Sequence, residues 1–225
     1  MQIVYLGHSS FKLKGKTGSV ITDPFSQGAV GFAFPTSSAD IITVSHAHDD
    51  HNAVAAVKST SRRDRPFIVT KPGEYEVGGI SVFGVSTFHD DNSGALRGEN
   101  TVFTILLDGL RICHLGDLGH ALSQEQVEAI GSVDILLCPV GGVFTIDPTT
   151  AVKVIRQLEP AMVIPMHYNT DRHEVSIFGE LKTVNDFLTA YGVEVEPVSK
   201  LEVSNQKLPE ETEVVVMTPS ALAEA

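Results

Sequence analysis

Residues 41 to 51 read Ile41-Ile42-Thr43-Val44-Ser45-His46-Ala47-His48-Asp49-Asp50-His51, an apolar strand-like run that ends in histidines and aspartates. Side chains two positions apart in an extended segment point the same way, so His46 and His48 can hold one ion. If the chain turns into a helix at Asn52, Asp50 and His51 face another side and can hold a second ion beside the first. The cluster therefore predicts a two-metal site rather than a solvated polar loop.

Length and charge limit the class of protein. The 225 residues fit one compact domain spanning 1 to 225, and an apolar content of 42% can fill a core. The net charge of -12, from 28 acidic and 16 basic residues, argues against a broad phosphate-binding surface. We expect a small-molecule substrate and no nucleic-acid partner, and the sequence leaves a homo-oligomer open.

The cysteines and the lengths of the apolar runs indicate the cellular compartment in which the protein is expected. Cys113 and Cys138 each lie inside an apolar strand-like run and are predicted to be buried, reduced thiols. No apolar run approaches the roughly 20 residues of a membrane helix. The start, Met1 to Tyr5, lacks the basic and apolar regions of a signal peptide. These features predict a cytoplasmic protein without a membrane segment.

The chain alternates strands and helices. Strands are predicted at 3–6, 10–13, 19–22, 41–45, 67–70, 134–138, 161–165, 193–198 and 213–217, with hairpins at 74–77/80–85 and 101–107/110–115. Helices are predicted at 52–58, 123–130, 149–158 and 179–190, a surface loop at 25–38, and a frayed tail at 219–225. Ser123 is the expected N-cap of its helix, with Gln126 at the third helical position. Both halves of the chain have several antiparallel strands followed by alternating strands and helices. This order fits two sheets packed face to face with helices outside.

Candidate metal ligands stand where strands end. They are His46, His48, Asp50 and His51, then His89, Asp117 and His167. Five imidazoles and two carboxylates suit zinc first, with manganese or iron as alternatives. One carboxylate must bridge if each ion is to have four protein ligands. We assign this role to Asp117, because nearby glycines let the backbone approach closely.

The order His46-x-His48-x-Asp50-His51, then His89, Asp117 and His167, resembles the metallo-β-lactamase superfamily of hydrolases along nearly the whole chain. The resemblance implies an α/β fold, a four-layer αββα sandwich of mostly antiparallel mixed sheets with a two-metal site at its edge. It also implies that His46, His48 and His89 bind the first metal ion, that Asp50, His51 and His167 bind the second, and that Asp117 binds both.

Further motifs indicate which branch of the superfamily the chain resembles. They are Leu6-Gly7-His8-Ser9-Ser10-Phe11, Thr22-Asp23-Pro24, Pro139-Val140-Gly141-Gly142 with Phe144-Thr145-Ile146-Asp147, and Met166-His167-Tyr168-Asn169-Thr170. Together they resemble the short, single-domain relatives of L-ascorbate-6-phosphate lactonase. Common zinc β-lactamases carry cysteine where this chain has Asp117, and the di-iron oxidoreductases carry glutamate where it has His48, so neither activity is expected.

The expected function is metal-dependent hydrolysis of a small ester, lactone or phosphoester by a hydroxide that bridges two metal ions. Asp50 is the expected catalytic residue, orienting the hydroxide and accepting its remaining proton. The alternatives are a nuclease or phosphodiesterase, and a regulatory metal-binding protein that has lost turnover. The sequence does not select the substrate.

Several other residues are expected near the site. His8, Arg97 and Tyr168 are candidate substrate contacts, although His8 could equally be a hydrogen-bond partner behind the metal ligands and Arg97 an exposed loop residue. Asp49 is expected to orient a ligand imidazole. His120 and His173 are expected at the surface, and His114 in the core.

Overall fold

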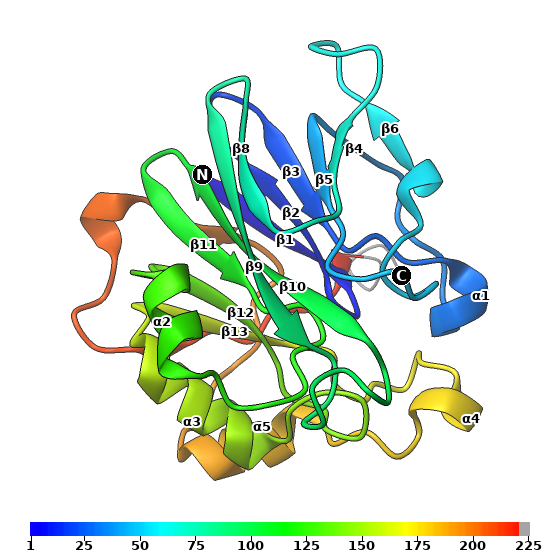
Figure 1. The fold of residues 1–225 in the computed structure, drawn as a ribbon, viewed down its shortest axis with the longest axis vertical. Coiled ribbons are helices and arrows are strands. Elements are labelled where there is room, and N and C mark those ends of the chain that lie inside the picture. Colours follow the sequence, from blue (N-terminus) through cyan, green and yellow to red (C-terminus); the bar gives the residue numbers. More distant parts are fainter. Residues whose placement is uncertain (221–225) are drawn as a thin grey trace.

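The computed structural model describes residues 1 to 220, and two β-sheets packed face to face form its centre (Figure 1). The first sheet has the strand order β14-β1-β2-β3-β5-β7. Its strands are β1 (Gln2–Gly7), β2 (Ser10–Lys14), β3 (Ser19–Thr22), β5 (Ile41–Thr43), β7 (Phe67–Val69) and β14 (Leu201–Glu202). Strands β1 to β3 are antiparallel, whereas β3, β5 and β7 run parallel. The carboxyl ends of β3 and β5 therefore meet at one edge.

The second sheet has the strand order β15-β13-β12-β11-β10-β9-β8. Its strands are β8 (Gly73–Val77), β9 (Ile80–Phe88), β10 (Glu99–Leu107), β11 (Leu110–His114), β12 (Ile135–Pro139), β13 (Met162–Met166) and β15 (Glu213–Val214). Strands β8 to β11 are antiparallel to their neighbours, and β11, β12, β13 and β15 are parallel. Strands β9, β11 and β13 consequently point the same way, so that their carboxyl ends meet at one edge.

Apolar side chains of both sheets form the main core. Phe11 and Ile41 of the first sheet and Phe103 of the second belong to one fully buried cluster. Helices α2 (Gln124–Ile130), α3 (Pro148–Leu158) and α5 (Val184–Tyr191) cover the outer face of the second sheet (Figure 1). Strand β12 is buried along its whole length, as expected for a parallel strand covered on both faces.

The outer face of the first sheet is covered without a long helix. The predicted helix at 52–58 is wrong, because the chain forms the 3₁₀ turn η1 (Val54–Ala56) and then β6 (Val57–Ser59), which pairs with β4 (Ser37–Ala39). The buried Val57 packs in a smaller apolar cluster on this face. Burial of this β-branched residue against the sheet outweighs the helical spacing of the alanines. The predicted loop at 25–38 contains helix α1 (Gln27–Val30) and the start of β4.

The carboxyl-terminal third also differs from expectation. The predicted helix at 179–190 begins later than expected, as α5, because a capping box of Thr183 and Asp186 starts it there. A separate short helix, α4 (Val175–Phe178), precedes it. Residues 193–198 form no regular strand, and Val198 makes only an isolated bridge to Met217. Residues 221–225 of the predicted tail lie outside the described residues.

Other predictions are confirmed. Both hairpins form, and Ser123 and Gln126 make the predicted capping box of α2. Cys113 and Cys138 are free and buried, and burial raises the pKa of the Cys113 thiol to about 12. Across residues 1 to 220, every helix is too short or too polar to cross a membrane.

Candidate metal centre

The predicted ligands meet at the edge where the strand ends converge. His46, His48, Asp50 and His51 lie in the loop after β5, while His89, Asp117 and His167 follow β9, β11 and β13. His51, His89, Asp117 and His167 are buried, whereas His48 is exposed and Asp50 is half-buried. The loop is not extended as the spacing argument assumed, since His51 donates its backbone N–H to the His48 carbonyl in a turn. This turn separates Asp50 and His51 from His48 without a helix.

Asp117 occupies the centre of the cluster. Its Oδ2 lies 3.2 Å from Nε2 of His167, 3.3 Å from Nε2 of His51 and of His89, and 3.9 Å from Nε2 of His46. Gly119 must lack a side chain, because a Cβ there would overlap the backbone of Asp90. The four distances show that one carboxylate oxygen of Asp117 faces imidazoles from both sets of ligands, as a bridging ligand would.

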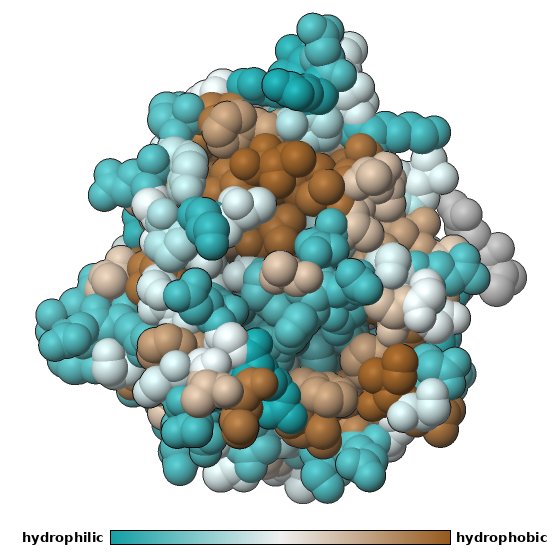
Figure 2. Space-filling model, turned by 45° about the vertical axis from the view of Figure 1, so that its right-hand side comes forward, coloured by the Kyte–Doolittle hydropathy of each residue, from teal (hydrophilic) through white to brown (hydrophobic). Residues whose placement is uncertain are grey.

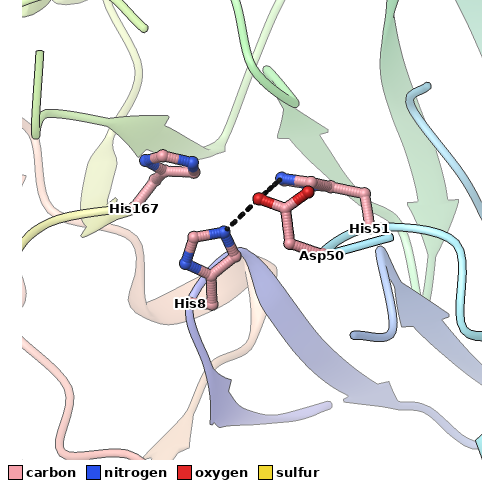
Figure 3. Close-up of side chains that lie close together, drawn as sticks. All are labelled: His8, Asp50, His51 and His167. Atoms are coloured by element: carbon pink, nitrogen blue, oxygen red, sulfur yellow. Dashed lines mark hydrogen bonds and ion pairs between the residues drawn. The ribbon is translucent and has the colours of Figure 1, made fainter. Parts of the chain in front are cut away.

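Three groups of side chains in residues 1 to 220 could hold a metal ion, and one of them is Asp23 with His46 and His51. In the other two, ligand atoms of His46, His48 and His89 (the first group) lie within 4.8 Å of one another, and so do those of His8, Asp50, His51 and His167 (the second group). This is the division that the resemblance implies, with His8 added to the second group. Figure 3 shows the second group, with His8 and His51 on either side of the Asp50 carboxylate.

The chemistry of these groups fits metal ions. Nε2 of His46, His51 and His167 and Oδ1 of Asp117 are buried and have no hydrogen-bond partner among residues 1 to 220. Buried polar atoms are normally paired, so unpaired nitrogens facing one carboxylate need another partner. Imidazole nitrogens and carboxylate oxygens at this density are the ligand set of zinc and similar divalent ions.

Asp23, at the end of β3, orients two ligands from behind. Its Oδ2 accepts from His51 Nδ1 at 2.9 Å and from Ser45 Oγ at 2.5 Å, and Ser45 Oγ also lies 2.9 Å from His46 Nδ1. A proton on Nδ1 of His51 leaves the Nε2 lone pair free for a metal ion. Asp49, which was expected to do this, is exposed, and no side-chain hydrogen bond from it to a ligand imidazole is found in residues 1 to 220. The sequence motif contained Asp23 but gave no sign that it reaches His51.

A chain of hydrogen bonds positions Asp50. The Thr170 backbone N–H donates to His173 Nδ1 at 3.2 Å, which places the His173 proton on Nε2. That proton is donated to His8 Nδ1 at 3.2 Å, so His8 carries its own proton on Nε2 and donates it to Asp50 Oδ2 at 3.2 Å. Burial lowers the pKa of His8 to about 4 and that of His173 to about 3, so both rings are neutral. The surface position expected for His173 is wrong, because its side chain packs directly behind His8.

The remaining candidates occupy different places. Tyr168 is buried in the main core, 6.5 Å from Tyr5 between ring centroids, and is not among the residues that line the cavity over the candidate ligands. The His120 ring accepts from the Phe88 backbone N–H, and His114 is buried. Arg97 does border the site, with its guanidinium 5.5 Å from the Phe144 ring centroid.

A cavity of about 450 Å³ opens onto the metal ligands. It is lined by the ligands His48, Asp50, His89 and Asp117 and by the rim residues Ala29, Leu96, Arg97, Phe144, Ile177 and Phe178. Figure 2 shows this side of the molecule as a hydrophilic depression with hydrophobic surface beside it. A small substrate that entered would meet polar ligands at the floor and an apolar rim with one cation.

Asp90 holds the loop that carries Arg97. Its carboxylate accepts backbone N–H groups from Asn92, Gly94, Leu96 and Arg97 at 2.7 to 3.0 Å. These bonds lower the pKa of Asp90, although its burial opposes the shift. A carboxylate that accepts several backbone N–H groups fixes the shape of a loop, and here it fixes one wall of the cavity.

Comparisons with known proteins agree with this geometry. Residues 2–167 match the model of the Beta-lactamase superfamily domain. A UPF0173 metal-dependent hydrolase of Thermococcus onnurineus is 33% identical over 192 residues, covering 76% of this chain and 85% of that protein. A homologue with the same name from Desulforamulus reducens is 32% identical over 199 residues, with the same coverage of 76% and 85%.

Solved structures agree as well. A Thermotoga maritima protein assigned as a zinc-dependent hydrolase of the metallo-beta-lactamase superfamily is 38% identical, has a TM-score of 0.77, and covers 96% of this chain and 97% of its own. A metallo hydrolase from Ignicoccus hospitalis, at 20% identity and a TM-score of 0.66, covers 97% of this chain and 95% of its own and shares the fold. The chain therefore belongs to the metallo-β-lactamase superfamily, among the UPF0173 metal-dependent hydrolases.

Proposed function

We propose that this protein is a binuclear hydrolase that cleaves a small ester, lactone or phosphoester. The observation that carries the proposal is the position of Asp117 Oδ2, within 3.2 to 3.9 Å of imidazole nitrogens from both ligand groups. A single carboxylate oxygen shared in this way fits two adjacent ions better than one. Zinc suits the ligand set first, and manganese or iron are alternatives.

Two divalent ions held by the candidate ligands would supply a water that loses a proton near neutral pH and a positive charge that polarises the substrate. Asp50 lines the cavity, and in this proposal its carboxylate orients the attacking water and accepts a proton from it. Burial alone would raise the pKa of Asp50, but His51 and His8 hold it well below its usual range. The carboxylate is therefore ionised at neutral pH, and the hydrogen bond from His8 fixes its orientation.

The rim favours a small, partly apolar substrate. Phe144, Ile177 and Phe178 offer apolar contacts, and Arg97 is placed to contact a negatively charged or strongly polar group. The net charge of -12 opposes a nucleic-acid substrate, so the rim and the charge favour a small molecule over a nuclease role.

The test is metal analysis combined with a hydrolysis screen. The purified protein is loaded with zinc or manganese, its metal content is measured, and p-nitrophenyl acetate and bis-p-nitrophenyl phosphate are offered. We expect two ions per chain and turnover that is abolished by a chelator and restored by the metal. Two bound ions without turnover of either compound class, or of a wider set of lactones and phosphoesters, would favour the regulatory alternative.

A further inference from the structure

A second cavity, of about 680 Å³, adjoins the metal centre on the side of β5 and β7. His48 and Arg97 line this cavity as well as the one over the candidate ligands, so the two cavities are adjacent at these residues. Ser45 and Thr101 also line it, and the Thr101 backbone N–H donates to the Ser45 carbonyl at 2.9 Å. The cavity thus lies where the edges of the two sheets are joined, directly beside the first ligand group.

Its lining is largely apolar. Val44, Ala47, Val54, Ile68 and Pro72 contribute hydrophobic surface, and Ile68 is 46% exposed although it is a large aliphatic residue. The charged residues of the lining are Lys71, Arg97 and Glu99. In Figure 2 hydrophobic surface lies directly above the hydrophilic depression, in agreement with this lining. An apolar pocket open to a catalytic centre is the usual arrangement for binding the non-reacting part of a substrate.

We propose that this second cavity, here called the side pocket, binds the apolar acyl chain of an ester or lactone substrate. The inference rests on the proposed hydrolase function and adds the substrate class. Because the side pocket adjoins the metal centre at His48, a chain bound in it places the attached carbonyl group at the ligands. A volume of about 680 Å³ has room for a chain of several methylene groups.

The first experiment varies the acyl chain. The metal-loaded full-length protein is given p-nitrophenyl acetate, butyrate and hexanoate, and kcat/KM is measured for each. Burial of each added methylene should raise kcat/KM by about fourfold, until the chain fills the side pocket. Equal kcat/KM values for the three esters would overturn the proposal.

Strand β7 supplies a matched pair of variants. Ile68 lines the side pocket, while Phe67, 40% exposed, points to the opposite face of the same strand and contacts Tyr75. Ile68→Glu should lower the ratio of hexanoate to acetate kcat/KM by about tenfold or more, and Phe67→Glu should leave that ratio unchanged. Both positions are solvent-accessible, so both variants are expected to fold, as circular dichroism can verify. Equal ratios in the two variants would contradict the assignment.

A binding measurement separates this inference from the proposed function. Octanoate is titrated into the metal-loaded protein, and the backbone amide signals are followed by NMR. Shifts at Val54, Ile68 and Lys71, with those at Val54 and Lys71 lost in Ile68→Glu, support the side pocket even if no ester is hydrolysed, in which case only the hydrolase proposal fails. Hydrolysis of the esters without chain-length preference and without these shifts rejects the side pocket and leaves the hydrolase proposal standing.

Discussion

Replacing Asp23 with asparagine should weaken metal binding although Asp23 itself lies behind the ligands. In the native protein its Oδ2 accepts the proton on His51 Nδ1 at 2.9 Å. Asp23 Oδ1 accepts the Ser45 backbone N–H at 2.8 Å, and an asparagine can keep this bond only with its amide oxygen. The amide nitrogen then stands in place of Oδ2 and is a donor, so His51 must move its proton to Nε2 to avoid two facing donors. Nε2 lies 3.3 Å from Asp117, on the side of the metal centre, and a protonated Nε2 cannot bind a metal ion.

The size of the effect follows from the bonds affected. Partners behind a metal ligand typically contribute 10- to 100-fold in affinity, and we expect about 100-fold here because the tautomer of His51 is reversed as well as its orientation lost. The second ion should be lost before the first. Affinity is measured by competition with a fluorescent chelator, and the tautomer by ¹⁵N NMR of the imidazoles.

Asp49→Asn provides the control, because this neighbouring carboxylate is exposed and should leave both affinities unchanged. Equal losses in Asp23→Asn and Asp49→Asn would refute the reasoning. So would normal metal affinity in Asp23→Asn with His51 still protonated on Nδ1.

Other substitutions test the centre at separate points. Asp117→Ala should reduce the binding of both ions, and His89→Ala should mainly empty the first site; elemental analysis of the two variants distinguishes a shared ligand from two independent sites. Asp50→Asn should lower kcat by roughly 100-fold or more, with a smaller loss of metal, because it keeps an oxygen ligand and removes the proton acceptor; unchanged kcat with full metal content would leave Asp50 as a ligand only. His173→Phe keeps the aromatic packing against Phe178, at 5.2 Å between centroids, but removes the donor to His8. It should lower kcat by about tenfold with little change in KM, and a change confined to thermal stability would show a purely structural role. The thiols should be unreactive to a disulfide reagent at pH 8 until the protein unfolds, because burial raises the pKa of Cys113 to about 12 and holds it protonated well above that pH.

Much of the architecture could be predicted from local patterns. The hairpin across Asp108 and Gly109 and the capping box at Ser123 formed as expected, since turn and cap preferences act within a few residues. Helix prediction failed at 52–58 because Val57 is buried against the first sheet, a contact that depends on residues far away in the chain. The helix predicted at 179–190 began late for a local reason, the cap at Thr183, which the spacing of apolar residues concealed.

The sequence by itself determined which residues are candidate ligands: histidines and aspartates at the ends of apolar strands can be recognised from composition and spacing, because strand ends in parallel arrangement share an edge. The tertiary structure alone decided which groups support them. Asp23, not Asp49, reaches His51, since β3 and β5 are adjacent parallel strands. His173 lies against His8, and Tyr168 points into the core. Pairings of this kind depend on the register between distant strands and on side-chain packing, and no local sequence pattern encodes either.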